Sequence, residues 1–128
     1  MPRAAFERMA EEALGRLPRR FRDLLYNVQI ETRCFPRREA GRWDGSASLL
    51  GLYSGLTREQ MKSPLSGSYL PARIILYQRN LERVSADAAD LARRVAETLA
   101  HEIAHHLGFD EEAVQRAMRR RPKRRKTP

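Results

Sequence analysis

Residues 85–108 read SADAADLARRVAETLAHEIAHHLG, and this pattern predicts one long amphipathic helix. Ser85 belongs to the residue types that cap helix N-termini, and residues 86–107 contain neither glycine nor proline. Gly108 can end the helix in a left-handed turn. Apolar side chains recur along one side of the helical wheel, at Leu91, Val95, Leu99 and Ile103. We therefore expect this helix to pack one face against the core.

The three histidines of the chain lie near the end of this helix, where residues 101–105 spell the motif H-E-x-x-H. Because residues four positions apart lie about 40° apart around a helix, His101 and His105 project on the same side and can share one metal ion. That side is polar, whereas His106 falls within the apolar arc and is expected to be a buried structural histidine. Glu102 lies beside the pair, where it can act as general base on a metal-bound water. A solvated helix face that spells the motif by chance is the alternative.

A catalytic zinc ion takes three protein ligands, so the motif needs one more. No other histidine faces the right way and Cys34 is distant in sequence, so we expect a carboxylate. Three acidic residues follow the helix, Asp110, Glu111 and Glu112, and a left-handed turn at its end lets the chain carry them back toward the histidines. We predict Glu111 as the third ligand and Asp110 as the alternative, although capping of a following helix suits Asp110 better.

The rest of the chain predicts a small mixed domain. Alternating or β-branched segments predict strands over residues 28–32, 49–53 and 73–77. Apolar spacing predicts helices over residues 3–17, 19–26 and roughly 111–120. Proline, glycine and charged residues mark residues 35–47 as a loop and 56–72 as a long connection. We therefore expect an α+β fold in which a small sheet packs on the long helix, with further N- and C-terminal helices.

The chain has 128 residues, which suits one domain, and a formal net charge of +9 from 25 basic and 16 acidic residues. Eight of the basic residues and none of the acids lie in residues 116–128. We therefore expect a domain over residues 1–115, with its final helix running to about residue 120, and a disordered basic tail over 116–128. Such a tail indicates either a solubilising end or weak contact with nucleic acid or another acidic surface.

Several classes of protein are excluded by the sequence. A single cysteine, Cys34, excludes an intramolecular disulfide framework and a multi-cysteine zinc finger. No run approaches the roughly 18 apolar residues of a membrane span, and the first residues lack the apolar core of a secretory signal. We expect a soluble cytoplasmic protein that makes no contact with membranes.

Three segments of the chain resemble the small bacterial zincin-like metallopeptidase family, whose members are also called minimal metalloproteases. HEIAHHLG at residues 101–108, with the acids that follow, is similar to the family signature H-E-x-x-H-x-x-G-x-x-D. LGLYSG at residues 50–55 and LPARIILY at residues 70–77 are similar to the family segments G-L-Y-x-G and L-P-x-x-I-x-L-Y. The resemblance covers roughly residues 5–118.

The resemblance implies a compact zincin-like domain, one zinc ion, and hydrolysis of peptide bonds in a peptide or protein substrate. By position, His101 and His105 match the zinc ligands, and Glu102 matches the catalytic base. Glu111 falls at the third-ligand position, where the family mostly has aspartate. In the implied mechanism, zinc activates a water and polarises the scissile carbonyl while Glu102 transfers the proton.

The resemblance also leads us to expect that substrate adds as an extra strand at a sheet edge, and we predict residues 73–77 to be that edge. Tyr53, Tyr69 and Tyr77 are candidates for donating a hydrogen bond to the oxyanion, although each also fits a packed aromatic. Three alternative functions stay open: a zinc-binding domain without turnover, a metal hydrolase with another substrate, and a nucleic-acid-associated protein that acts through its basic tail.

Overall fold

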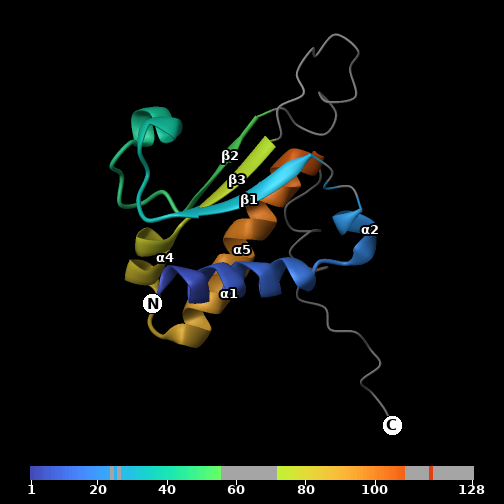
Figure 1. The fold of residues 1–128 in the computed structure, drawn as a ribbon, viewed down its shortest axis with the longest axis horizontal. Coiled ribbons are helices and arrows are strands. Elements are labelled where there is room, and N and C mark those ends of the chain that lie inside the picture. Colours follow the sequence, from blue (N-terminus) through green and yellow to red (C-terminus); the bar gives the residue numbers. More distant parts are fainter. Residues whose placement is uncertain (24, 26, 56–71, 109–115, 117–128) are drawn as a thin grey trace.

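The computed structural model describes residues 1–23, 25, 27–55, 72–108 and 116. Its fold is of the α+β class predicted from the sequence (Figure 1). In chain order the elements are α1 (Arg3–Gly15), α2 (Arg19–Arg22), β1 (Val28–Arg33), the 3-10 helix η1 (Arg38–Trp43), β2 (Gly51–Ser54), β3 (Ala72–Tyr77), α4 (Gln78–Val84) and α5 (Ala88–Leu107). Almost all of the predicted connection over 56–72, of the predicted final helix and of the basic tail lies outside the described residues.

The strands form one sheet in the order β1–β3–β2, with β3 parallel to β1 and antiparallel to β2. β3 is therefore the central strand, and the prediction that residues 73–77 form the edge is wrong. The physical reason is burial on both faces: the successive side chains Ile74, Ile75, Leu76 and Tyr77 are all fully buried. A strand that is apolar and covered on both faces belongs in the middle of a sheet. Among the described residues, β1 and β2 form the two edges.

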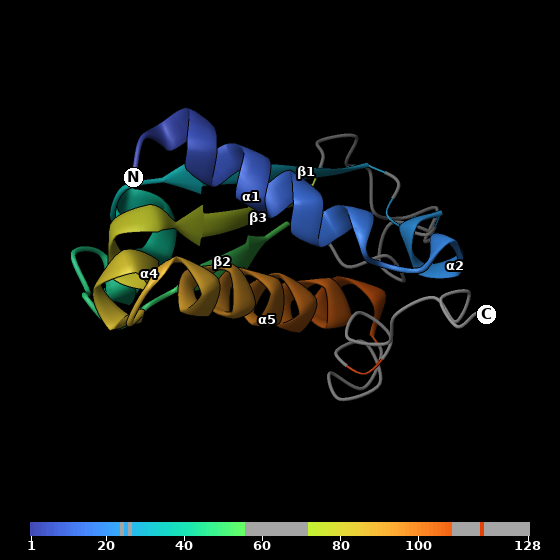
Figure 2. The same cartoon turned by 90° about the horizontal axis from the view of Figure 1, so that it is seen from below.

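α1 and α5 pack side by side and cover one face of the sheet (Figure 2). The buried stripe of α5 is the one predicted from its apolar spacing, and it shares a core with Ile74 and Leu76 of β3 and Phe6 of α1. The same core holds Ala10, Ala13, Leu17, Leu81, Leu91, Val95, Leu99 and Ile103. α5 also contacts β2 directly, so its polar motif lies close to one edge of the sheet.

The ends of α5 are fixed by local hydrogen bonds. The side chain of Asp87 accepts a hydrogen bond from the N–H of Asp90 at 2.8 Å and caps the helix N-terminus. Ser85, the predicted cap, instead follows the unpredicted helix α4, and its hydroxyl donates to the carbonyl of Leu81 at 2.7 Å. Gly108 ends α5 with φ 72°, as predicted. None of the helices in the described part of the chain is both long and apolar enough to cross a membrane.

Candidate metal centre

The last turns of α5 present the H-E-x-x-H motif at the boundary between core and solvent. His101 and His105 are exposed, and the side chain of His101 is 57% exposed. His106 is fully buried. The predicted facing of all three histidines is therefore confirmed. The two predicted ligands share the open side of the helix, where an ion from solvent can reach them.

Glu102 is buried, although it lies beside the exposed pair: only 7% of the residue is accessible. Its Oε2 lies 3.8 Å from Nε2 of His101, so the carboxylate is turned toward the histidine side of the helix. A carboxylate that is shielded from bulk water and close to the imidazole of His101 is well placed for proton transfer.

Tyr53 of β2 joins this cluster from the sheet. Its Oη lies 2.5 Å from Nδ1 of His106, and the two side chains share a hydrogen bond. Its ring also contacts His105, with a centroid separation of 4.9 Å and an interplanar angle of 35°. Burial raises the pKa of Tyr53 to about 12, so the hydroxyl keeps its proton at neutral pH. Tyr53 therefore links the buried histidine to one of the predicted metal ligands.

Close packing between β2 and α5 brings Tyr53 to the motif. Gly51 shares the helix-facing side of β2 with Tyr53, because the two residues lie opposite Leu76 and Ile74 of β3. A Cβ atom added to Gly51 would lie 2.6 Å from Cγ2 of Thr98 on α5. Glycine at this position therefore lets the strand and the helix approach each other closely.

The donor set fits a zinc ion as far as the structure describes it. Two exposed imidazoles one helical turn apart are ligands that zinc prefers, and a carboxylate lies beside them. Within the described residues, no group of three or more His, Cys, Asp or Glu side chains is arranged to hold a metal ion. Glu111 and Asp110 lie outside those residues, so the identity of the third ligand stays a prediction.

The comparison with known families agrees with this geometry. The profile described as "Zincin-like metallopeptidase" matches residues 25–120, which is most of the chain. The chain belongs to the zincin-like metallopeptidase family. The matched range contains all three strands and the whole of α5 with its motif. No curated protein matches the chain. Family membership supports a metallopeptidase as the broad class of activity.

Tyr77 of this zincin-like domain has a structural role and is not part of the motif cluster. It is fully buried, and its hydroxyl donates to Oε2 of Glu39 at 2.8 Å. Burial and this hydrogen bond raise its pKa. The packed-aromatic interpretation is therefore confirmed for Tyr77. Tyr69 lies outside the described residues, which leaves Tyr53 as the tyrosine that the structure brings to the motif.

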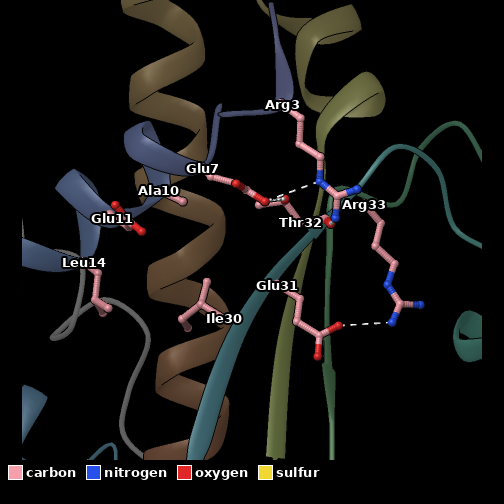
Figure 3. Close-up of a pocket in the computed structure, with 9 residues that line it drawn as sticks. All are labelled: Arg3, Glu7, Ala10, Glu11, Leu14, Ile30, Glu31, Thr32 and Arg33. Atoms are coloured by element: carbon pink, nitrogen blue, oxygen red, sulfur yellow. Dashed lines mark hydrogen bonds and ion pairs between the residues drawn. The ribbon is translucent and has the colours of Figure 1, made fainter. Parts of the chain in front are cut away.

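A separate cavity of about 560 Å³ lies between α1 and the edge strand β1 (Figure 3). Its charged side chains largely neutralise one another. Arg3 donates to the carbonyl of Thr32 at 2.6 Å and lies 3.3 Å from Glu7, while Arg33 lies 3.1 Å from Glu31. The lining contains no histidine or cysteine. This cavity therefore lacks the donor chemistry of the zincin-like motif on α5.

Proposed function

We propose that this chain is a zinc-dependent peptidase that hydrolyses peptide bonds at the H-E-x-x-H motif of α5. The observation that carries the proposal is the arrangement of three side chains. His101 and His105 are exposed on one side of the helix, and the buried carboxylate of Glu102 lies 3.8 Å from Nε2 of His101. Membership of the zincin-like metallopeptidase family supports the same class of reaction.

In this proposal, each motif residue has one task. His101 and His105 hold the ion together with a carboxylate, Glu111 or the alternative Asp110. Zinc, when bound, supplies a Lewis acid that lowers the pKa of water and polarises the scissile carbonyl. Glu102 takes the proton from the attacking water and passes it to the leaving amine. Its burial keeps competing bulk water away from the carboxylate during this transfer.

The edge strand β2 is the proposed site for an extended substrate, in place of the central strand β3. The carbonyl of Leu50 accepts a hydrogen bond from the N–H of Tyr77 at 3.0 Å, which marks a hydrogen-bonded pair of the antiparallel ladder. Such pairs alternate along the strands, so Gly51 and Tyr53 direct their main-chain groups away from β3. A peptide that pairs with Tyr53 would therefore run beside His105.

The test compares Glu102→Gln with Glu97→Gln, a matched substitution five residues earlier on the same helix, where the side chain is 46% exposed. We expect Glu102→Gln to bind zinc like the wild type. Its rate of peptide hydrolysis should fall at least about 100-fold, because general-base catalysis is removed. Glu97→Gln should keep both properties. Zinc content is measured by elemental analysis, and cleavage is measured by mass spectrometry on a broad peptide library.

Two results would overturn the proposal. Wild-type protein without zinc, even after zinc is offered at neutral pH, would exclude the metal site. Zinc binding that is lost in His101→Ala, together with cleavage that is equal in Glu102→Gln and the wild type, would exclude the catalytic role. Near-stoichiometric zinc without any cleavage would favour the zinc-binding domain without turnover.

A further inference from the structure

We propose that Tyr53 is a positioning residue for the metal ligand His105. It holds the imidazole of His105 from the β2 side while its own hydroxyl is anchored on the buried His106. This inference rests on the proposed function, because it assigns Tyr53 a task at the proposed zinc site. It adds a residue from the sheet, 52 positions before His105 in the sequence, to a site that the motif places wholly on α5.

The hydroxyl of Tyr53 is anchored on a buried side chain. His106 is fully buried, and the 2.5 Å separation between its Nδ1 and Oη of Tyr53 fixes the far end of the tyrosine side chain. His106 is also the chain neighbour of His105, so the anchor and the ligand share one turn of α5. A hydrogen bond to a side chain that packing already holds in place restricts the rotation of the phenol.

The ring of Tyr53 contacts the predicted ligand His105 directly. The centroids of Tyr53 and His105 are 4.9 Å apart with the planes tilted by 35°, which lies within the range of attractive aromatic pairs. His105 is exposed toward solvent, and Tyr53 contacts its ring from the sheet. Metal-binding histidines generally depend on a neighbouring group that fixes their orientation. Here the neighbour acts through its ring, and the hydroxyl is used to hold that ring.

The strand that carries Tyr53 is paired with the central strand of the sheet. Its backbone lies opposite Ile74 of the central strand, and Ile74 is fully buried. Two residues earlier, Gly51 lets β2 approach α5 closely enough for the tyrosine to reach the histidines. A positioning group on a packed strand defines geometry better than one on a loop.

Tyr77 provides a matched control for this role. It lies on the adjacent strand of the same sheet, it is buried, and its hydroxyl also makes one side-chain hydrogen bond, to Glu39. Tyr53→Phe and Tyr77→Phe therefore remove the same atom, and with it the part-buried hydrogen bond to His106 or to Glu39. Only the first substitution changes a residue whose ring contacts His105.

The experiment measures zinc affinity by competition with a chromophoric chelator, with folding checked by circular dichroism. We expect Tyr53→Leu, which loses both ring and hydroxyl, to weaken zinc binding by about 10- to 100-fold. Tyr53→Phe keeps the ring and should weaken it by only about threefold, whereas Tyr77→Phe should stay within about twofold of the wild type. The visible spectrum of the cobalt(II)-substituted protein should change in both Tyr53 variants and stay unchanged in Tyr77→Phe.

The outcomes separate this inference from the proposed function. If the wild type binds no zinc, or if His101→Ala binds zinc as tightly as the wild type, the proposed function fails and this inference fails with it. If His101→Ala loses zinc but Tyr53→Leu binds like the wild type, only the role of Tyr53 is overturned. Equal losses of affinity in Tyr53→Phe and Tyr77→Phe would also overturn it, because the effect would then reflect general destabilisation. If Tyr53→Leu does not fold, the affinity and the cobalt spectrum of Tyr53→Phe decide.

Discussion

The β1 side and the β2 side of the sheet each hold a tyrosine that makes a side-chain hydrogen bond, but the surroundings of the two tyrosines differ. On the β1 side, Glu39 accepts hydrogen bonds from the hydroxyl of Tyr77 at 2.8 Å, the N–H of Arg37 at 3.0 Å and the guanidinium of Arg33 at 3.1 Å. Arg33 also pairs with Glu31. In this Glu39 network, acceptors and donors satisfy one another, and the network ties η1 to the sheet.

On the β2 side, the half-buried Tyr53 likewise shares a side-chain hydrogen bond, here with His106. Two imidazoles nevertheless remain exposed on α5, next to the buried carboxylate of Glu102. A contribution to folding stability explains this arrangement poorly, because ion pairs among exposed groups add little to the free energy of unfolding. The difference teaches that a hydrogen-bonded tyrosine alone does not mark a functional site. The distinguishing feature is a pair of exposed imidazoles beside a buried carboxylate.

Breaking the Glu39 network should give the largest loss of stability and leave the proposed zinc site intact. Glu39→Gln removes the charge that accepts three hydrogen bonds, and hydrogen bonds to charged groups contribute about 1.5–3 kcal/mol each when a partner is removed. We expect the free energy of unfolding to fall by about 2 kcal/mol at neutral pH. Zinc affinity should be unchanged. Urea unfolding and the chelator competition measure the two quantities.

The pH dependence of this loss provides its control. Burial alone would raise the pKa of Glu39, but hydrogen bonds from Arg37 and Tyr77, with the charge of Arg33, outweigh burial and hold the pKa below its ordinary value. The stability that the ionised group contributes is therefore present above the unfolded pKa of about 4.3 and is lost as the pH falls through the lower folded pKa. The gap between wild type and Glu39→Gln should shrink in acid. A gap that stays constant down to strongly acidic pH would contradict this account.

The helices and strands were largely predictable because they depend on local pattern. All three strands were found within two residues of the predicted bounds, and the facing of the histidines on α5 followed from helical periodicity. The helix α4 was missed because its buried residues are mainly polar. Asn80, for example, is buried and donates to the carbonyls of Ser46 and Leu49, each at 2.9 Å. Tertiary hydrogen bonds replace the apolar stripe that would have indicated a helix.

The order of the strands and the contacts of Tyr53 with the motif histidines were not predictable in the same way. Strand order depends on which edges meet in space, and the prediction placed β3 at the edge although its sequence is apolar on both faces. The sequence marked Tyr53 as one of three equivalent tyrosines. Its contact with His106 joins residues 53 positions apart, a separation over which local pattern carries no signal. Only the packing of β2 on α5 distinguishes Tyr53 from Tyr77.

A substitution at the contact between β2 and α5 should affect stability and zinc binding together. In Gly51→Ala the new Cβ would meet Cγ2 of Thr98 at 2.6 Å and the carbonyl oxygen of Ile75 at 3.3 Å. We expect the free energy of unfolding to fall by about 1.5 kcal/mol, as is typical of overpacking, and zinc affinity to fall several-fold because Tyr53 moves with its strand. Thermal unfolding and chelator competition measure the two effects.

Two further variants test that explanation. Gly15→Ala adds the same methyl group where, among the described residues, no atom beyond its chain neighbours and its own helix backbone lies within 4 Å. It should leave both quantities unchanged or slightly improved. Thr98→Ser removes the methyl group that would clash, so Gly51→Ala combined with Thr98→Ser should recover most of the loss. Failure of this rescue would mean that the close approach of strand and helix does not set the position of Tyr53.

The smallest effect is expected at the opposite end of α5, where a loss of stability should leave zinc affinity at the proposed site unchanged. Asp87→Ala removes the cap that accepts the N–H of Asp90 at 2.8 Å, which should lower the free energy of unfolding by about 0.5–1 kcal/mol. Asp87→Asn keeps a good cap and should change it by only a few tenths. His101 lies about 21 Å along the helix, so zinc affinity should be the same in both variants. A loss of affinity in Asp87→Ala as large as in Gly51→Ala would show that zinc binding follows general stability, and the distinction between the two sides of the sheet would then fail.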